Sequence, residues 1–256
     1  MTEKYFLRFK AKDFTGAGLL IDNVIKPIKG DMYGDYEIID INYDPDDIEF
    51  LPPCEPQKII CVGLNYADHA DESTLDAIPE EPLLFFKPTS SLIGHKASII
   101  KPNWVDRVDY EGEIAAVIGK TMRYVDQAEA EAGIFGYTCV NDVTARNMQK
   151  KDKQWTRPKG FDTFCPVGPY IAVGIDAAGL DIQTRLNGKV VQKAKTSMMM
   201  RGPAEVISYI SKVMTLYPGD LISTGTPKGV GPVQDGDKVE VEIEKIGTLV
   251  NTVSEE

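Results

Sequence analysis

Two glutamates at the start of a predicted β-strand are the first residues whose types and spacing suggest chemistry. Glu111 and Glu113 lead into the apolar run Ile114–Ile118, whose length and composition predict a buried strand. Alternate side chains of a strand point to the same face, so the two carboxylates should lie side by side, with Gly112 between them. Neighbouring carboxylates at the mouth of a buried strand repel each other, and each must take up a proton or gain a counter-charge.

A divalent cation would supply that counter-charge, and oxygen-only ligands favour Mg²⁺, Mn²⁺ or Ca²⁺ over Zn²⁺. A Glu-x-Glu pair alone is more often a solvated strand end than a pair of ligands. Here a third acid, Asp142, ends another strand-like run at 135–142. The three acids together therefore favour a cation site, with Glu111, Glu113 and Asp142 as candidate ligands.

The sequence contains two histidines, so few residues could act as a base near neutral pH. His69 stands three residues before Glu72 in segment 64–72, which should form at most one or two helical turns. At that spacing the carboxylate can hydrogen-bond the imidazole and raise its basicity, although a surface histidine beside an acid is the commoner explanation. His95 has no acid at a useful spacing, and we assign it a structural role. The polar, acidic segment 73–82 has the composition of a mobile loop or lid.

The lysines of the central region differ in their expected surroundings. Segment 158–169 is too rich in glycine and proline for a helix, and we expect Lys159 to lie there in an ordered loop. Lys150, Lys151 and Lys153 belong to a lysine-rich loop and should be solvated. Lys159 is therefore the better candidate for a functional lysine.

Composition sets the frame for these candidates. With 256 residues and 43% hydrophobic side chains, the chain can bury a full core. No apolar run is long enough to span a membrane and the N-terminus lacks a signal peptide, so we expect a soluble, cytoplasmic protein. A net charge of -11 argues against sequence-independent binding to nucleic acid or to an anionic membrane. The four cysteines show no metal-binding spacing and are expected to be buried free thiols.

The elements that must position the candidates divide into two groups. Residues 1–55 are predicted to form a small β-rich N-terminal domain, joined by a proline-rich linker near 52–57 to a main domain at 56–256. Predicted strands lie at 5–9, 16–21, 37–41, 58–63, 82–88, 220–224 and 238–244, with a hairpin at 184–191. Helices are predicted at 126–132 and 203–214, the second with apolar residues 206, 207, 210, 213 and 214 on one face. The strands at 58–63 and 82–88 should be buried.

Five short motifs occur in an order that resembles the fumarylacetoacetate hydrolase (FAH) family. They lie at 63–72, 109–113, 141–146, 159–164 and 224–227, and the likeness spans roughly residues 58–250. The resemblance implies an α+β, mainly β fold, with a mixed β-sandwich or β-roll catalytic domain and a small N-terminal domain. It also implies a homodimer.

The resemblance further implies a Mg²⁺ or Mn²⁺ ion, with Ca²⁺ as an alternative, held by Glu111, Glu113 and Asp142. His69 and Glu72 would be a water-activating dyad on a closing lid.

By the same residue-wise transfer, Lys159 would stabilise an enolate or oxyanion. Arg146 and Gln149 would face the substrate, and Thr226 would hold a carboxylate or carbonyl oxygen. Asn147 stands where family members often have Asp.

The partner implied is a small 2-oxo acid, which can chelate a metal through one carboxylate oxygen and the keto oxygen. With an activated water, such a site would hydrolyse a C–C bond in a short acylpyruvate, for example fumarylpyruvate or acetylpyruvate. Without one, it would serve as an oxaloacetate decarboxylase or tautomerase, or as an isomerase or dehydratase of another 2-oxo acid. A non-catalytic binding protein would need neither the dyad nor Lys159. We expect the acylpyruvate hydrolase.

Overall fold

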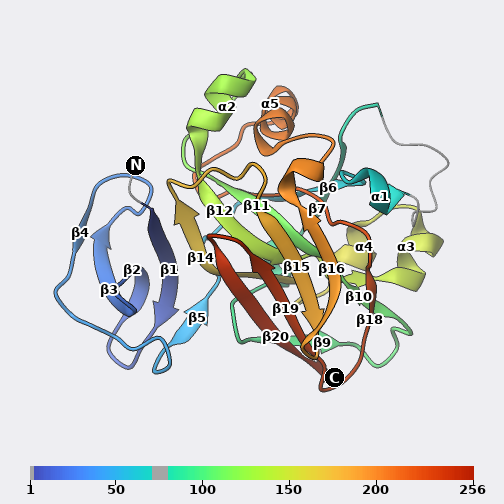
Figure 1. Ribbon diagram of the computed structural model, residues 1–256, viewed down its shortest axis with the longest axis horizontal. Helices are drawn as coiled ribbons and strands as arrows, with labels where there is room; N and C mark the ends of the chain where they lie inside the picture. Colours follow the sequence, from blue (N-terminus) through green and yellow to red (C-terminus); the bar gives the residue numbers. More distant parts are fainter. Residues whose placement is uncertain (1–2, 71–79) are drawn as a thin grey trace.

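The structure, a computed structural model, describes residues 3–70 and 80–256, and far more of these residues lie in β-strands than in helices (Figure 1). The mainly β, α+β fold class is therefore confirmed. Three sheets have twelve, five and three strands. Among the described residues, no helix is long and apolar enough to cross a membrane.

The twelve-stranded sheet contains both the N-terminal strands and the strands of the centre of the molecule. Its strand order is β4 (Tyr36–Ile38), β3 (Val24–Gly30), β2 (Thr15–Ile21), β1 (Lys4–Lys10), β14 (Cys165–Val173), β12 (Ile134–Asn141), β11 (Gly112–Ile118), β17 (Leu221–Ser223), β6 (Ile59–Gly63) and β7 (Leu83–Lys87). Off this path, β5 (Glu49–Leu51) pairs with β1 and β8 (Leu92–Ile93) pairs with β14. Neighbours on the main path are antiparallel except β17 and β6.

The five-stranded sheet has the order β16 (Lys189–Lys195), β15 (Asp181–Leu186), β19 (Lys238–Ile243), β20 (Gly247–Glu255) and β9 (Ser98–Lys101). Its strands β15, β16, β19 and β20, orange to red in Figure 1, lie across β11, β12 and β14. The three-stranded sheet has the order β13 (Thr144–Ala145), β10 (Val108–Tyr110) and β18 (Gly231–Val233). The helices are α1 (Ala67–Ala70), α2 (Gln127–Gly133), α3 (Arg146–Asp152), α4 (Thr156–Lys159) and α5 (Pro203–Val213), with 3₁₀ turns at Thr89–Ser91 and Thr196–Met198.

Strand β11 is buried along its whole length because both of its faces meet a hydrophobic core. Ile114 and Ala116 pack with Val241 and other residues of the five-stranded sheet. Ala115, on the opposite face, packs with Phe6 of the N-terminal strands. A strand covered on both faces needs a continuous apolar run rather than alternation. The prediction of a buried strand here is confirmed.

The N-terminal strands join the large sheet directly, since Phe6 of β1 pairs with Ile171 of β14. One sheet therefore runs through both parts of the chain, and the division at residue 55 into two domains stays a prediction. Strand β3 was not predicted. Its hairpin with β2 turns at Asp22 and Asn23, both at positive φ as a type I′ turn requires.

Several details of the sequence prediction are wrong, among them the lysine-rich loop, because Lys150 and Lys151 lie in α3. Strand β7 is not buried: it is the edge of the large sheet, and Phe86 is 46% exposed, whereas Lys87 at its end is buried. Segment 158–169 begins in a helix, because α4 includes Pro158 and Lys159. Proline is tolerated there since the first-turn N–H groups have no helical partner. Val213 of α5 is 57% exposed and lies outside the apolar face assigned to it.

Candidate active site

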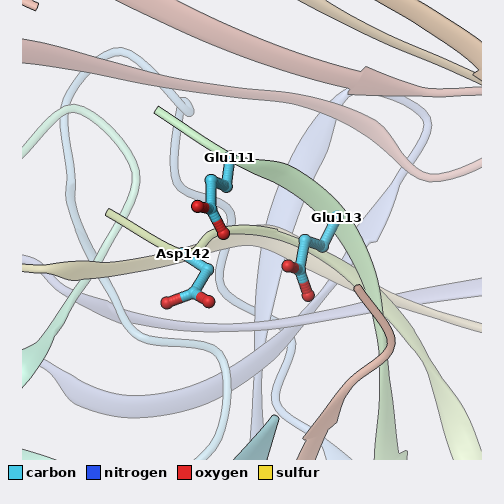
Figure 2. Close-up of side chains that lie close together, drawn as sticks. All are labelled: Glu111, Glu113 and Asp142. Carbon is cyan, nitrogen blue, oxygen red and sulfur yellow. The ribbon is translucent and has the colours of Figure 1, made fainter. Parts of the chain in front are cut away.

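The three predicted acidic ligands lie together where β11 begins and β12 ends. Glu111 occupies the break between β10 and β11, Glu113 lies in β11, and Asp142 directly follows β12. Antiparallel pairing of Gly112 with Asn141 brings the two chain segments side by side. Each of the three carboxylates is buried, and one oxygen of each lies within 4.8 Å of the others (Figure 2).

Gly112 allows this close packing because a side chain would not fit. A Cβ atom at this position would lie 2.1 Å from Oγ1 of Thr184, which packs from β15. The backbone of Gly112 is also fixed on both sides: its N–H donates to Oε1 of Gln192 at 3.0 Å, and its carbonyl accepts from the hydroxyl of Thr226 at 3.0 Å. The Glu-Gly-Glu segment is thereby held between the two larger sheets.

Glu113 is stabilised by neutral donors. Its Oε2 accepts a hydrogen bond from the Ser223 hydroxyl and another, at 2.8 Å, from the Gly225 N–H. Gly225 has a φ of +96°, and a Cβ there would come within 2.9 Å of Asn65, so glycine is required at this turn. Burial, with the nearby charge of Asp142, raises the pKa of Glu113 to about 8.

Two buried lysines offset the charge of Asp142. Lys159 donates to Oδ2 of Asp142 at 2.6 Å and to Oε2 of Glu111 at 2.7 Å. Lys87 donates to the other oxygen, Oδ1, at 2.6 Å and to the carbonyl of Val143 at 3.2 Å. Burial alone would lower the pKa of Lys159, but the charges of Asp142 and Glu111 outweigh it and the pKa lies above its ordinary value.

Arg146 links the remaining acids of the site. It donates to Asp109 Oδ2 at 2.8 Å and to Glu111 Oε1 at 2.5 Å, and its Nη1 donates to Gln149 Oε1 at 2.7 Å. Arg107 donates to both oxygens of Asp109 from the other side, at 2.7 and 3.0 Å. Burial opposes the charge of Arg146, yet Glu111 and Asp109 hold its pKa above the ordinary value.

The hydroxyl group of Thr226 donates its proton in a hydrogen bond within the protein. Its Oγ1 donates to the Gly112 carbonyl and accepts, at 2.8 Å, from Nε2 of Gln192. The orientation of the Gln192 amide is fixed by its surroundings, because Oε1 faces an N–H and Nε2 also faces the carbonyl of Pro227 at 2.8 Å. Thr226 therefore offers a lone pair to the cavity.

A cavity of about 620 Å³ opens over these residues. Seven predicted site residues line it: Glu111, Glu113, Asp142, Arg146, Gln149, Lys159 and Thr226. Apolar walls come from Val62, Phe85 and Trp155 among others, and Lys159 lies 5.1 Å over the ring of Phe85. A mixed apolar and charged pocket of this size is typical of a small-molecule site.

The proposed dyad is placed only in part. His69 lies in α1, close in sequence to the pocket residues Val62 to Leu64, and its side chain is outside the described part of the structure. Glu72 and most of the predicted lid lie outside the described residues. His95 lies elsewhere: its Nδ1 accepts from the Val250 N–H at 3.0 Å and its ring packs edge-on against Phe50. The structural role assigned to His95 is confirmed.

Residues of the site that were not assigned a role from the sequence include Lys87, Arg107, Asp109, Gln192 and Ser223. The sequence could have indicated a role for Lys87, because a lysine at the end of an otherwise apolar strand needs a partner of opposite charge if it is buried. Nothing in the sequence indicated a role for Gln192, because its partners lie on other elements at least 34 residues away in the sequence.

The donor set fits a divalent cation. Three buried carboxylates converge, and all their donor atoms are hard oxygens. Arg146 and two lysines offset Glu111 and Asp142, whereas Glu113 has no ion pair among the described residues, so a cation would supply the missing positive charge. No sulfur or imidazole ligand joins the cluster among the residues that the structure describes. An all-oxygen set of this kind is typical of a site for a hard divalent cation.

Residues 58–254 match the protein family described as "Fumarylacetoacetate (FAA) hydrolase C-terminal". The chain belongs to the fumarylacetoacetate hydrolase family. Residues 6–53 match a second family, described as "Rv2993c-like, N-terminal". The family resemblance of the five motifs is thereby confirmed.

Named relatives in this family catalyse several reactions. Oxaloacetate tautomerase FAHD2A, a mitochondrial protein of Bos taurus, is 42% identical over 220 residues, which is 81% of this chain and 70% of the relative. The 2-hydroxyhepta-2,4-diene-1,7-dioate isomerase of Mycobacterium marinum has 40% identity and a TM-score of 0.92, with 99% of both chains covered. Maleylpyruvate hydrolase from Sphingobium sp. SYK-6, solved with manganese(II) and pyruvate, has 28% identity and a TM-score of 0.81, covering 98% of this chain and 99% of that one. Family members are thus hydrolases, isomerases and tautomerases.

Proposed function

We propose that this protein is a divalent-metal-dependent enzyme that hydrolyses a C–C bond in a short acylpyruvate. The observation that carries the proposal is the convergence of Glu111, Glu113 and Asp142 beside the ammonium of Lys159 at the base of one cavity. Manganese(II) and pyruvate bound to a structural relative of the same fold support the same ligand chemistry.

A cation bound by the three acids would polarise the keto oxygen of a 2-oxo acid as a Lewis acid. The residues of the chain contribute the rest. Lys159 places a fixed positive charge where negative charge develops during C–C cleavage, and in a buried site such a charge stabilises an enolate more strongly than water does. Arg146 and Gln149 line the cavity wall and would orient the substrate. The lone pair of Thr226 would accept from a hydroxyl or a water molecule.

In the hydrolytic step, His69 would take a proton from water, with Glu72 holding the imidazole in position. The water oxygen adds to the distal carbonyl, the bond between that carbon and the neighbouring CH₂ breaks, and a proton returns to the CH₂ carbon. The products are a carboxylic acid and pyruvate, so one water molecule balances the reaction.

Oxaloacetate tautomerisation is the second candidate. It uses the same enolate-stabilising groups and requires no attack by water on the substrate. The identity of 42% to a bovine oxaloacetate tautomerase favours it specifically. The two candidates therefore differ in whether His69 activates water.

Paired kinetics on acetylpyruvate and oxaloacetate, with Mg²⁺ and with Mn²⁺, separate the candidates. The parent should hydrolyse acetylpyruvate, and His69→Ala should lower kcat for hydrolysis by about 10²–10⁴-fold, the usual contribution of a general base. The affinity of His69→Ala for Mn²⁺ should equal that of the parent, which serves as the control. Undiminished hydrolysis by His69→Ala would refute the role of the dyad. A parent that acts on oxaloacetate and on no acylpyruvate would establish the second candidate.

A further inference from the structure

Lys87 is a buried cation that touches the site without lining its cavity. Its side chain has 0% exposure, and its ammonium contacts Oδ1 of Asp142 and the carbonyl of Val143. The residues that line the described cavity include Lys159 and do not include Lys87. Lys87 therefore lies behind Asp142, and it can influence a bound molecule through its charge and through that carboxylate, without contact.

The two lysines hold opposite oxygens of the same carboxylate. Lys159 donates both to Oδ2 of Asp142 and to Oε2 of Glu111, so it faces the acid cluster and the cavity. Lys87 holds Oδ1, the oxygen away from Lys159. A ligand entering from the cavity meets Lys159 directly, whereas the charge of Lys87 stays fixed in place.

The charges at the base of the cavity can be counted. Asp109 faces Arg107 and Arg146, and Arg146 also pairs with Glu111. The ionisable group therefore contains four acids and four bases: Asp109, Glu111, Glu113 and Asp142 with Arg107, Arg146, Lys87 and Lys159. With all eight ionised, this group carries no net charge. A divalent cation gives it two net positive charges, which attract the carboxylate of a 2-oxo acid.

We propose that the positive charge of Lys87, next to Asp142, sets the net charge of the metal-bound site. Lys87 thereby lowers the affinity for the cation and raises the affinity for the anionic substrate. Without Lys87 this ionisable group would carry one net negative charge, and a divalent cation would leave it with one positive charge instead of two. Attraction for the cation would rise and attraction for a 2-oxo carboxylate would fall. Lys87 is thus a positioning residue, and this role rests on the proposed metal-dependent function.

The opposite signs of the two effects separate this role from a purely structural one. If Lys87 only kept Asp142 in its rotamer, its loss would weaken cation binding, and substrate binding would weaken with it. A charge effect instead strengthens one and weakens the other. At an effective dielectric constant near 20 and a separation of about 8–10 Å, one unit charge changes an anion's affinity by roughly 15- to 30-fold.

The test is calorimetry on the full chain in two steps, first with Mn²⁺ alone and then with pyruvate added to the Mn²⁺-loaded protein. Lys87→Met should bind Mn²⁺ more tightly than the parent and pyruvate roughly 15- to 30-fold more weakly. Lys87→Gln, which keeps a hydrogen-bond donor and loses the charge, should show the same pair of shifts. If melting curves show that Lys87→Met does not fold, the two affinities are measured on Lys87→Gln alone. Lys58→Met is the matched control. The ammonium of Lys58 lies 2.7 Å from Oδ2 of the buried Asp220, and neither residue lines the cavity, so both affinities should stay at the parent values.

Weaker binding of both Mn²⁺ and pyruvate by the Lys87 variants would overturn the proposal in favour of a structural role. Unchanged binding of pyruvate would overturn it as well, as would a Lys87→Gln variant that behaves like the parent. A parent that binds no Mn²⁺ would instead refute the proposed function itself.

Discussion

Each buried acid of the site has its charge offset in a different way. Asp109 faces two arginines, Glu111 faces Arg146 and Lys159, and Asp142 faces two lysines. Glu113 takes part in no ion pair among the described residues, and its carboxylate accepts from a hydroxyl and a backbone N–H, with a pKa raised to about 8 by burial. Glu113 is therefore the acid that gains most from a bound cation.

His95 supplies a residue-scale prediction that is independent of the site. Burial, with the nearby positive charge of Lys96, lowers its pKa to about 4 from 6.5, because both disfavour the protonated ring. The folded protein then binds fewer protons than the unfolded chain between these values, so stability should fall as pH drops from 6.5 toward 4, by up to about 3 kcal/mol. Urea unfolding at a series of pH values measures this loss.

His95→Asn is the matched variant for that measurement, since its Oδ1 can replace the accepting nitrogen without titrating. It should show a flatter stability profile between pH 4 and 6.5 than the parent. Equal profiles for the two proteins would contradict the assignment.

At the scale of elements, the site depends on how closely β15 packs on β11. A Cβ on Gly112 would lie 2.1 Å from Thr184 Oγ1. Gly112→Ala should therefore cost about 1–3 kcal/mol of stability through overpacking, measured by chemical denaturation. Adding Thr184→Ala should recover most of that loss, because it removes the clashing atom, which has no hydrogen-bond partner. A Gly112→Ala protein as stable as the parent would show that the sheets can separate freely.

Sequence reasoning succeeded where the deciding contacts are local. The Glu-Gly-Glu segment, the buried run after it and the Asn187–Gly188 hairpin turn are each visible within a few residues. It failed where a distant partner decides. Lys87 meets Asp142 across 55 residues and Gln192 meets Gly112 across 80, so neither role could be inferred from spacing. The exposed side of β7 was missed because an edge strand and a central strand have similar apolar runs.

At the scale of the whole molecule, we propose the homodimer implied by the family resemblance. The twelve-stranded sheet ends at β7, which pairs only with β6 in the described chain and exposes Phe86. Open edges and apolar side chains are commonly covered by a two-fold partner. Light scattering at micromolar concentration should give about twice the chain mass of 28.3 kDa. A mass equal to one chain at every concentration would count against it.

The central claim is that Glu111, Glu113 and Asp142 hold one divalent cation, and Mn²⁺ titration calorimetry tests it most directly. The parent should bind one Mn²⁺ per chain. Glu113→Gln, which keeps the shape of the side chain and removes its charge, should bind at least about a hundred-fold more weakly while its circular dichroism and melting behaviour stay those of a folded protein. Binding of Mn²⁺ by Glu113→Gln with the parent's affinity and stoichiometry would contradict the account.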